Sequence, residues 1–339
     1  MPSPKLSRLF ALKHLPAWRR LVQAGYLLFI LYVGWIFYLF YLWAIGGSET
    51  FTARPPAVEG FLPIGALVAL KRFVLTGAYD TIHPAGLTIF LAALATGLLL
   101  RKGFCGWICP VGCVSNLAEW FSRKRRWLAR PPVWIDFPML SLKYLLLFFF
   151  AYLILWKMDL RAIEGFMQTP YNKVVDAKML HFFISPSTTT LWVMGGLVVI
   201  SFFLRNFWCR YLCPYGALLG LLALPGLTRI SRKEENCINC GRCDRQCPGS
   251  IRVSSKKAVR SPECIGCLEC VAVCPAEDCL SLTVVRRRRV FPYLLPAAVI
   301  LLFLGFWLAA LATGHWHSDV PLATLKKLYL MMDGLGHPR

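Results

Sequence analysis

Eight of the fourteen cysteines form two copies of one pattern, C-x2-C-x2-C-x3-C-P. Four thiolates at this spacing bind a cubane iron–sulfur cluster, and where two runs follow one another, the fourth cysteine of each binds the other run's cluster. The spacing therefore predicts two 4Fe–4S clusters, and with them electron transfer. The expected ligand sets are Cys237, Cys240, Cys243 and Cys274 for the first cluster, and Cys264, Cys267, Cys270 and Cys247 for the second.

A zinc ribbon is the alternative interpretation, because paired C-x2-C motifs also bind zinc. It requires neither the third cysteine of each run nor Pro248 and Pro275 after the fourth cysteines. The pattern therefore favours clusters. The segment Glu234–Val285 is too small to fold on apolar burial alone, so its stability should come largely from cluster ligation.

A second group of cysteines lies in two matching C-x3-C-P loops. The stretch Phe104–Gly112 aligns with Trp208–Gly216 at a constant offset of 104, which pairs Cys105 with Cys209 and Cys109 with Cys213. A residue before proline avoids helical geometry, while proline suits the first helical turn, so Cys109 and Cys213 should be helix N-caps. The helix dipole and nearby cations then favour thiolate. These cations are Arg101, Lys102, Arg205 and Arg210.

Such thiolates could bind a metal or a further cluster, or act as redox dithiols. The alternative is that the cysteines close a tight, packed turn as small apolar residues. Cys113 and Cys279 lie outside both patterns and are interpreted as packed thiols.

The elements that must position these residues are membrane helices, since 57% of the residues are hydrophobic and 16% are charged. The predicted fold is an all-α polytopic membrane protein of five transmembrane helices, with an inserted α+β dicluster ferredoxin domain of the bacterial type. The five stretches are Leu21–Ile45, Ala85–Leu100, Pro138–Trp156, Thr188–Leu204 and Val290–Thr313. The second and fourth are short for a bilayer core, so we expect these helices to begin before their apolar runs. Lys143, inside the third stretch, is expected to snorkel to the surface.

The loops repeat because a larger unit repeats. The segment Ala57–Leu62 also aligns with Ala162–Met167, at an offset of 105. This predicts two duplicated two-helix units related by an axis along the membrane normal. The resulting domains are a basic arm at 1–20, repeat units at 21–130 and 131–232, a ferredoxin domain at 233–285, a fifth span at 286–313 and a tail at 314–339.

Most of the 38 Lys and Arg residues fall in the arm, in the connection between the repeats and around the ferredoxin segment. The positive-inside rule then predicts a cytoplasmic N-terminus and ferredoxin domain, and an outer C-terminus. Because this charge borders apolar spans, it predicts contact with the membrane rather than with nucleic acid. The tail, with His315, His317 and His337, is expected to be disordered or to dock, and binding of copper or another metal is the alternative.

Glu59, Glu164 and His83 are predicted on the outer side, in apolar surroundings. Oxidation of quinol releases protons, so these groups are candidates for a quinol or proton site. A helix cap or a structural ion pair is the alternative.

With these residues in view, the chain resembles the NapH/MauN-type membrane-bound polyferredoxins. The marks are Arg54-Pro55-Pro56, Val58–Pro63, His83–Gly86, the two C-x3-C-P loops and the paired cluster motifs. Relatives of this type include the core of the nitrous-oxide-reductase regulator and a ferredoxin protein of cytochrome-oxidase assembly. The resemblance implies a protein of the bacterial inner membrane with two 4Fe–4S clusters. It would pass electrons between the quinone pool and a partner reductase, dehydrogenase or second ferredoxin subunit. The alternative function is an assembly factor that reduces copper or thiols during maturation of another enzyme.

Overall fold

The computed structural model describes residues 12–129, 131–284 and 288–336. Lys5 and Arg8 of the basic arm, Arg286 and Arg287 before the last predicted span, and His337 lie outside the described residues. As far as it is described, the chain divides into two compact units. The first unit comprises Met1–Leu28, Ala93–Leu147 and Leu197–Leu302, and the second comprises Phe29–Ala92, Phe148–Gly196 and Phe303–Arg339.

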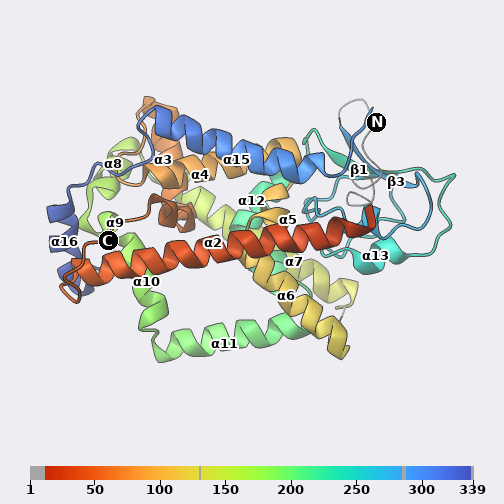
Figure 1. Cartoon of the computed structure of the whole chain (residues 1–339), viewed down its shortest axis with the longest axis horizontal. Helices are drawn as coiled ribbons and strands as arrows, with labels where there is room; N and C mark the ends of the chain where they lie inside the picture. Colours follow the sequence, from red (N-terminus) through yellow and green to blue (C-terminus); the bar gives the residue numbers. More distant parts are fainter. Residues whose placement is uncertain (1–11, 130, 285–287, 337–339) are drawn as a thin grey trace. The chain divides into compact units, whose positions relative to one another are not determined.

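Most of the described residues are helical (Figure 1). The longer helices are α2 (Leu15–Ala44), α3 (Pro63–Thr76), α4 (Pro84–Leu100), α6 (Pro110–Arg125), α7 (Val133–Ala151), α10 (Val175–Ile184), α11 (Thr188–Phe203) and α15 (Leu294–Ala312). The shorter ones are α5 (Gly103–Trp107), α8 (Leu160–Gln168), α9 (Pro170–Lys173), α12 (Pro214–Leu222), α13 (Arg242–Gln246), α14 (Glu269–Ala272) and α16 (Leu322–Leu330). Single turns of 3-10 helix are η1 (Leu12–His14), η2 (Pro56–Phe61) and η6 (Met332–Gly334), and π-helical turns are η3 (Tyr152–Lys157) and η4 (Trp208–Leu212).

Three helical stretches are long and apolar enough to cross a membrane: Leu12–Ala44, Val133–Lys157 and Leu294–Ala312. A fourth exists if α10 and α11, which meet at a bend of 77°, are counted as one broken span. The helix α4 is apolar but has 17 residues, fewer than the ~20 that a hydrocarbon core requires. Five spans are therefore not established by helix length.

The expected earlier start is confirmed for α4, by one residue, and is wrong for α11. The helix α4 begins at Pro84, and α11 begins at Thr188, directly after the bend. Prolines explain both ends, because the residue before a proline is driven out of helical geometry. Pro84 therefore stops the helix from extending upstream, and Pro186 interrupts the chain between α10 and α11.

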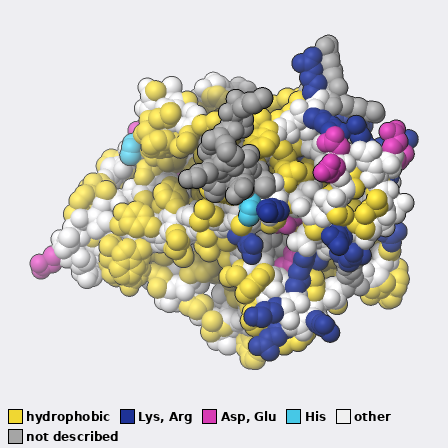
Figure 2. Space-filling model, turned by 45° about the vertical axis from the view of Figure 1, so that its right-hand side comes forward, with side chains coloured by type: hydrophobic (Ala, Val, Ile, Leu, Met, Phe, Trp, Pro, Cys, Tyr) yellow, Lys and Arg dark blue, Asp and Glu magenta, His cyan; other side chains and the backbone are white. Residues whose placement is uncertain are grey.

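Large apolar side chains lie on the outside of these helices. Trp156 and Trp192 are 80% and 79% exposed. Hydrophobic side chains cover much of the face shown in Figure 2. Exposed apolar area on this scale is costly in water and natural in lipid. The helices are those of a membrane protein.

The first unit contains a small antiparallel sheet in the order β2-β1-β3-β4. Its strands are β1 (Arg229–Arg232), β2 (Ala258–Val259), β3 (Leu280–Val284) and β4 (Arg288–Arg289). Ile230 pairs with Val259 on one side and with Leu282 on the other, and all three are buried. This apolar row is the core on which the cysteine loops rest, as predicted for an α+β ferredoxin segment.

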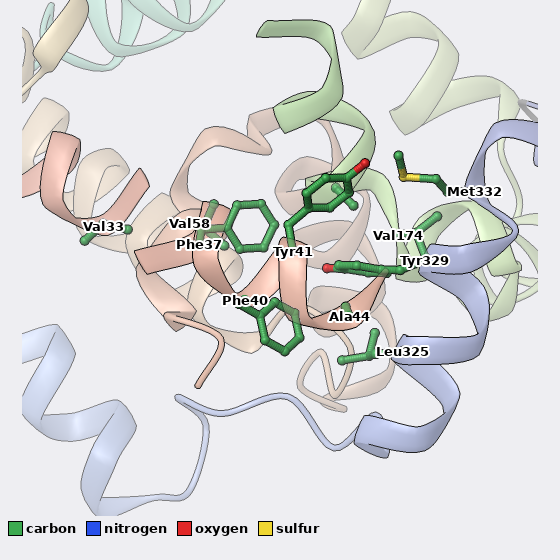
Figure 3. Packing of buried hydrophobic residues seen from close by; sticks show 11 residues of the cluster. Val33, Phe37, Phe40, Tyr41, Ala44, Val58, Val174, Leu325, Tyr329 and Met332 are labelled. Atoms are coloured by element: carbon green, nitrogen blue, oxygen red, sulfur yellow. The ribbon is translucent and has the colours of Figure 1, made fainter. Parts of the chain in front are cut away.

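The second unit has its own aromatic core, in which the tail takes part. Tyr329 of α16 lies beside Phe40 and Tyr41 of α2, with ring centroids 5.8 and 6.4 Å apart (Figure 3). Leu325 and Met332 are buried in the same cluster. Of the two expected states of the tail, disordered or docked, its described part shows the docked one, because these apolar side chains pack against α2.

Candidate functional site

The second predicted ligand set surrounds one cavity in the first unit. Cys247, Cys264, Cys267 and Cys270 all line it, together with apolar side chains that include Ile230, Ile251, Val253 and Val259. Burial raises the pKa of Cys247 to about 11 and also raises the pKa values of Cys267 and Cys270. Four thiols around a cavity lined mainly by apolar side chains fit a cubane, whose irons displace the thiol protons on binding.

The first predicted ligand set lies in a more open loop. Ile238, next to Cys237, is 66% exposed. The loop turns through Asn239 and Gly241, which both have left-handed backbone angles. Cys279 is buried and lies close enough to Cys237 and Cys274 for their charges to raise its pKa further, after burial itself. The fourth cysteine of the second run is thus near the first cysteine of the first run, as a crossed ligand arrangement requires.

The two C-x3-C-P loops meet in the first unit. Ser115 Oγ, on α6 after the first loop, lies 3.6 Å from Cys209 Sγ in the second loop. The rings of Phe104 and Tyr215, one from each loop, pack edge to face with centroids 5.8 Å apart. Cys105, Cys109, Cys209 and Cys213 are close enough for their charges to act on one another. The repeat therefore brings four sulfurs into one neighbourhood.

Cys109 and Cys213 are the N-caps of α6 and α12, as predicted from the prolines that follow them. Cys213 Sγ accepts a hydrogen bond from the backbone N–H of Gly216 at 3.2 Å. The expectation that the thiolate form is favoured is wrong, however, for Cys105, Cys109 and Cys209 in the protein alone, since burial raises the pKa of each thiol. Burial raises the pKa of Cys105 to about 12 and that of Cys209 to about 11, against the smaller opposing effect of Lys102.

Three of the four predicted cations bind elsewhere. Arg101 donates to Ser261 O at 2.8 Å, Arg205 to Cys247 O at 2.6 Å and Arg210 to Gly249 O at 2.5 Å. Three arginines next to the C-x3-C-P loops thus bind carbonyl groups of the ferredoxin segment. These hydrogen bonds form because the C-x3-C-P loops and the ferredoxin segment fold together in the first unit. The linear sequence does not show this arrangement.

One C-x3-C-P loop packs directly on the loop of the second ligand set. A Cβ added to Gly106 would lie 2.3 Å from Ile265 O, so the two backbones touch there. Trp107, fully buried, donates from Nε1 to Gly266 O at 3.1 Å. Arg19 and Gln23 of α2 each donate to Gly106 O at 3.0 Å. Cys105 and Cys109 therefore flank the segment that contacts the backbone between Cys264 and Cys267.

Lys143 does not snorkel, contrary to expectation. Its side chain is completely buried, and Nζ lies 2.6 Å from Glu263, the residue before Cys264. Because Lys143 pairs with the carboxylate of Glu263 inside the protein, its ammonium group does not need to reach the surface. Among the residues that the structure describes, no three or more His, Cys, Asp or Glu side chains could hold a single metal ion. A cubane spreads its four ligands over four irons and therefore needs sulfurs that are farther apart.

The three residues predicted on the outer side, Glu59, Glu164 and His83, lie in the second unit. The two glutamates differ in burial and in their partners. Glu59 is fully buried, with Oε1 at 2.8 Å from Arg54 and 3.5 Å from His83 Nδ1. Glu164 is half exposed, and Arg72 lies 3.8 Å from it. The structure thus places Glu59 beside His83, whereas Glu164 does not belong to this group of charges. The sequence analysis did not identify Asp176 and Tyr329, because neither residue belongs to a motif. It named Arg54 as part of a family motif but predicted no partner for it.

Comparison with known proteins finds two iron–sulfur family profiles in this chain. A family profile described as "4Fe-4S binding domain" matches residues 82–127 and again 187–233, the two C-x3-C-P regions. A second, described as "4Fe-4S dicluster domain", matches residues 230–282. YccM of Escherichia coli K12, named as an electron transport protein, is 38% identical over 94% of this chain and 92% of its own length.

The chain belongs to the NapH/MauN-type family of membrane-bound polyferredoxins. The ferredoxin-type protein NapH of Haemophilus influenzae is 28% identical over 76% of this chain and 85% of its own length. The methylamine utilization ferredoxin-type protein MauN of Methylorubrum extorquens is 27% identical over 56% and 62%. No solved structure matches the chain. This polyferredoxin is therefore a membrane iron–sulfur electron-transfer protein.

Proposed function

We propose that this polyferredoxin passes electrons between the quinone pool and a partner redox enzyme. Two 4Fe–4S clusters would be held by the two crossed cysteine sets, and they supply one-electron transfer when bound. The cavity lined by Cys247, Cys264, Cys267 and Cys270 supports the second set. The exposed loop that carries Cys237 supports a role for the cluster of the first set in electron exchange with the partner enzyme.

The observation that carries the proposal is the contact between Gly106 and Ile265. It joins a loop that contains two of the four clustered cysteines to a loop that contains two predicted cluster ligands. We propose that Cys105, Cys109, Cys209 and Cys213 form a further redox site, with a cluster as its occupant. Thiols buried as these are would need a metal to displace their protons.

The proposed membrane arrangement has five spans, with the ferredoxin domain in the cytoplasm and the C-terminus outside the inner membrane. The distribution of Lys and Arg supports this orientation. Two duplicated two-helix units are supported by the single family profile that matches both ranges. The short α4 would cross in a locally thinned bilayer, for which the cost is modest.

The test uses purified, anaerobic protein and a water-soluble quinol analogue. Reduction of the clusters by quinol, followed by electron paramagnetic resonance, is the expected result. Clusters that respond to dithionite but never to quinol would contradict it. If the protein then reduced copper(II) or a disulfide, the maturation function would replace the quinol function.

A matched pair of variants tests whether electrons from quinol pass through the C-x3-C-P cysteines. Cys109→Ala removes one thiol of the proposed further site, whereas Cys113→Ala removes a partly exposed thiol of α6. We expect Cys109→Ala to slow reduction by quinol and to leave reduction by dithionite intact. Cys113→Ala should change neither. Equal behaviour of the two variants would exclude the C-x3-C-P cysteines from the route.

A further inference from the structure

A closed group of charges lies inside the second unit, centred on Arg54. The guanidinium binds Glu59 Oε1 at 2.8 Å through Nη1 and Asp176 Oδ2 at 2.7 Å through Nε and Nη2. The side chains of both carboxylates have no exposed area, and that of Arg54 is 9% exposed. The spare oxygens are also used. Glu59 Oε2 accepts from Gly86 N, and Asp176 Oδ1 accepts from Ala177 N.

His83 completes the group, and its surroundings select a protonation state. Its Nε2 lies 2.7 Å from Asn172 O, which can only accept, so Nε2 carries a hydrogen. In a neutral ring Nδ1 is then a bare lone pair. That atom has no hydrogen-bond partner and lies 3.5 Å from Glu59 Oε1. A neutral His83 therefore points a lone pair at a carboxylate, while a protonated one donates to it.

The charge balance favours the same state. One arginine and two carboxylates leave the group with one net negative charge while His83 is neutral. An unbalanced charge is costly away from water, and a single proton on His83 removes it. Burial lowers the pKa of His83, but Glu59 and Asp176 raise it by more than burial and Arg54 lower it.

Neighbouring elements close the group. Asp80 accepts the backbone N–H groups of Ile82 and His83 at 2.8 and 3.2 Å. From the C-terminal helix α16, Tyr329 donates its hydroxyl to Asp176 Oδ1 at 3.0 Å. The arrangement thus binds one proton at a defined atom, His83 Nδ1, with Glu59 as its acceptor.

We propose that Glu59, His83, Arg54 and Asp176 form a one-proton site that accepts a proton when quinol is oxidised. This rests on the proposed function. Oxidation of one quinol to quinone releases two electrons and two protons. The two electrons pass singly to the iron–sulfur centres, one proton passes to His83 Nδ1, and the other passes to water. His83 must be neutral to act, so its protonation sets the pH dependence. Glu164 has no part in the site.

The experiment uses the full-length protein in lipid nanodiscs with isotope-labelled histidine. His83→Gln identifies the His83 resonance by its loss, and His181→Gln, on α10, is the matched control. We expect His83 to titrate above the ordinary imidazole value of about 6.5. Glu59→Gln should move this titration to lower pH. An ordinary titration that Glu59→Gln leaves unchanged would overturn the site.

A second measurement tests the coupling to quinol. The rate of cluster reduction by quinol should rise as pH passes through the His83 titration. His83→Gln should remove this step and slow the reaction by about 100-fold or more at high pH, since a lost general base has that effect. A raised His83 titration with a pH-independent rate would overturn the coupling. If quinol never reduces clusters that dithionite reduces, the proposed function fails, and the resonance titration alone decides the site.

Discussion

Lys143 Nζ lies 2.6 Å from both carboxylate oxygens of Glu263. Lys143 belongs to the apolar helix α7 and is completely buried, while Glu263 stands immediately before the predicted cluster ligand Cys264 and is 13% exposed. Tyr144, the next residue of α7, donates to Glu263 Oε1 at 3.1 Å. A membrane helix thus holds the first residue of a cluster loop by a buried charge pair. The geometry of the loop depends on that pair.

Breaking this pair should destabilise the first unit strongly. Lys143→Met and Glu263→Gln each leave one buried charge without its partner, and each should cost about 3–5 kcal/mol, whereas the double variant should recover much of the loss. Unfolding midpoints in detergent and iron per chain provide the measurement. Asp278→Asn is the control, because its pair with Arg289 is largely exposed and should contribute about 1 kcal/mol or less. Additive single effects would contradict a coupled pair.

Gly106→Ala should separate the two cysteine loops. The new Cβ would lie 2.3 Å from the backbone oxygen of Ile265, which cannot move aside as a side chain does. Gly165→Ala is the matched control, since nothing lies within 4 Å of the added carbon there. We expect Gly106→Ala to slow reduction by quinol while dithionite still reduces the clusters. If Gly106→Ala and Gly165→Ala behave alike, the contact has no role in electron transfer.

Local sequence patterns predicted the parts of the site that depend on local geometry. Cysteine spacing indicated the ligand sets, and prolines placed Cys109 and Cys213 at helix N-termini. Patterns failed where a distant partner decides the outcome. Lys143 looked like a snorkelling residue because Glu263, 120 positions later, shows no sign of facing it.

The internal repeat misled for a related reason. Glu59 and Glu164 align in sequence, yet Glu59 has Arg54 beside it and His83 opposite it. Glu164 lies on α8, with Arg72 as a distant partner. The two aligned residues thus differ in local structure, since Glu59 lies on η2 and Glu164 on α8, and in the charges around them. Loop position 106 shows the same divergence, because its counterpart Arg210 pairs with Asp136 at 2.7 Å.

Iron content tests the number of clusters. Two clusters give about eight iron atoms per chain, and a further cluster at the C-x3-C-P cysteines gives about twelve. Cys270→Ala should remove about four of these irons, because Cys270 lines the cavity of the second set. Cys113→Ala is expected to remove none. Iron and acid-labile sulfide, measured on anaerobic protein, give the result. A Cys109→Ala variant with the full iron content would exclude a cluster at that cysteine.

Tyr329→Phe should loosen the second unit. The hydroxyl donates to the buried Asp176 carboxylate, and hydrogen bonds to charged groups contribute about 1.5–3 kcal/mol. The aromatic packing against Phe40 and Tyr41 is kept, so the lost hydrogen bond accounts for the effect. Thermal unfolding in detergent is the measurement. Tyr32→Phe, at a side chain exposed on α2, is the control and should be neutral. An unchanged midpoint for Tyr329→Phe would show that Asp176 needs no donor from α16.

His83→Gln should lower stability in a pH-dependent way whose sign follows from the raised pKa of His83. A group with a higher pKa in the folded than in the unfolded state stabilises the protein fully below its unfolded pKa, here about 6.5. This contribution fades as pH rises through the folded pKa. The gap between wild-type and His83→Gln unfolding midpoints should therefore be widest below about pH 6.5 and narrow as the pH rises above it. His181→Gln, on α10, is the control for the loss of an imidazole. A His83→Gln gap that widens with rising pH would mean that the neutral ring is the stabilising form, and that Glu59 does not receive its proton.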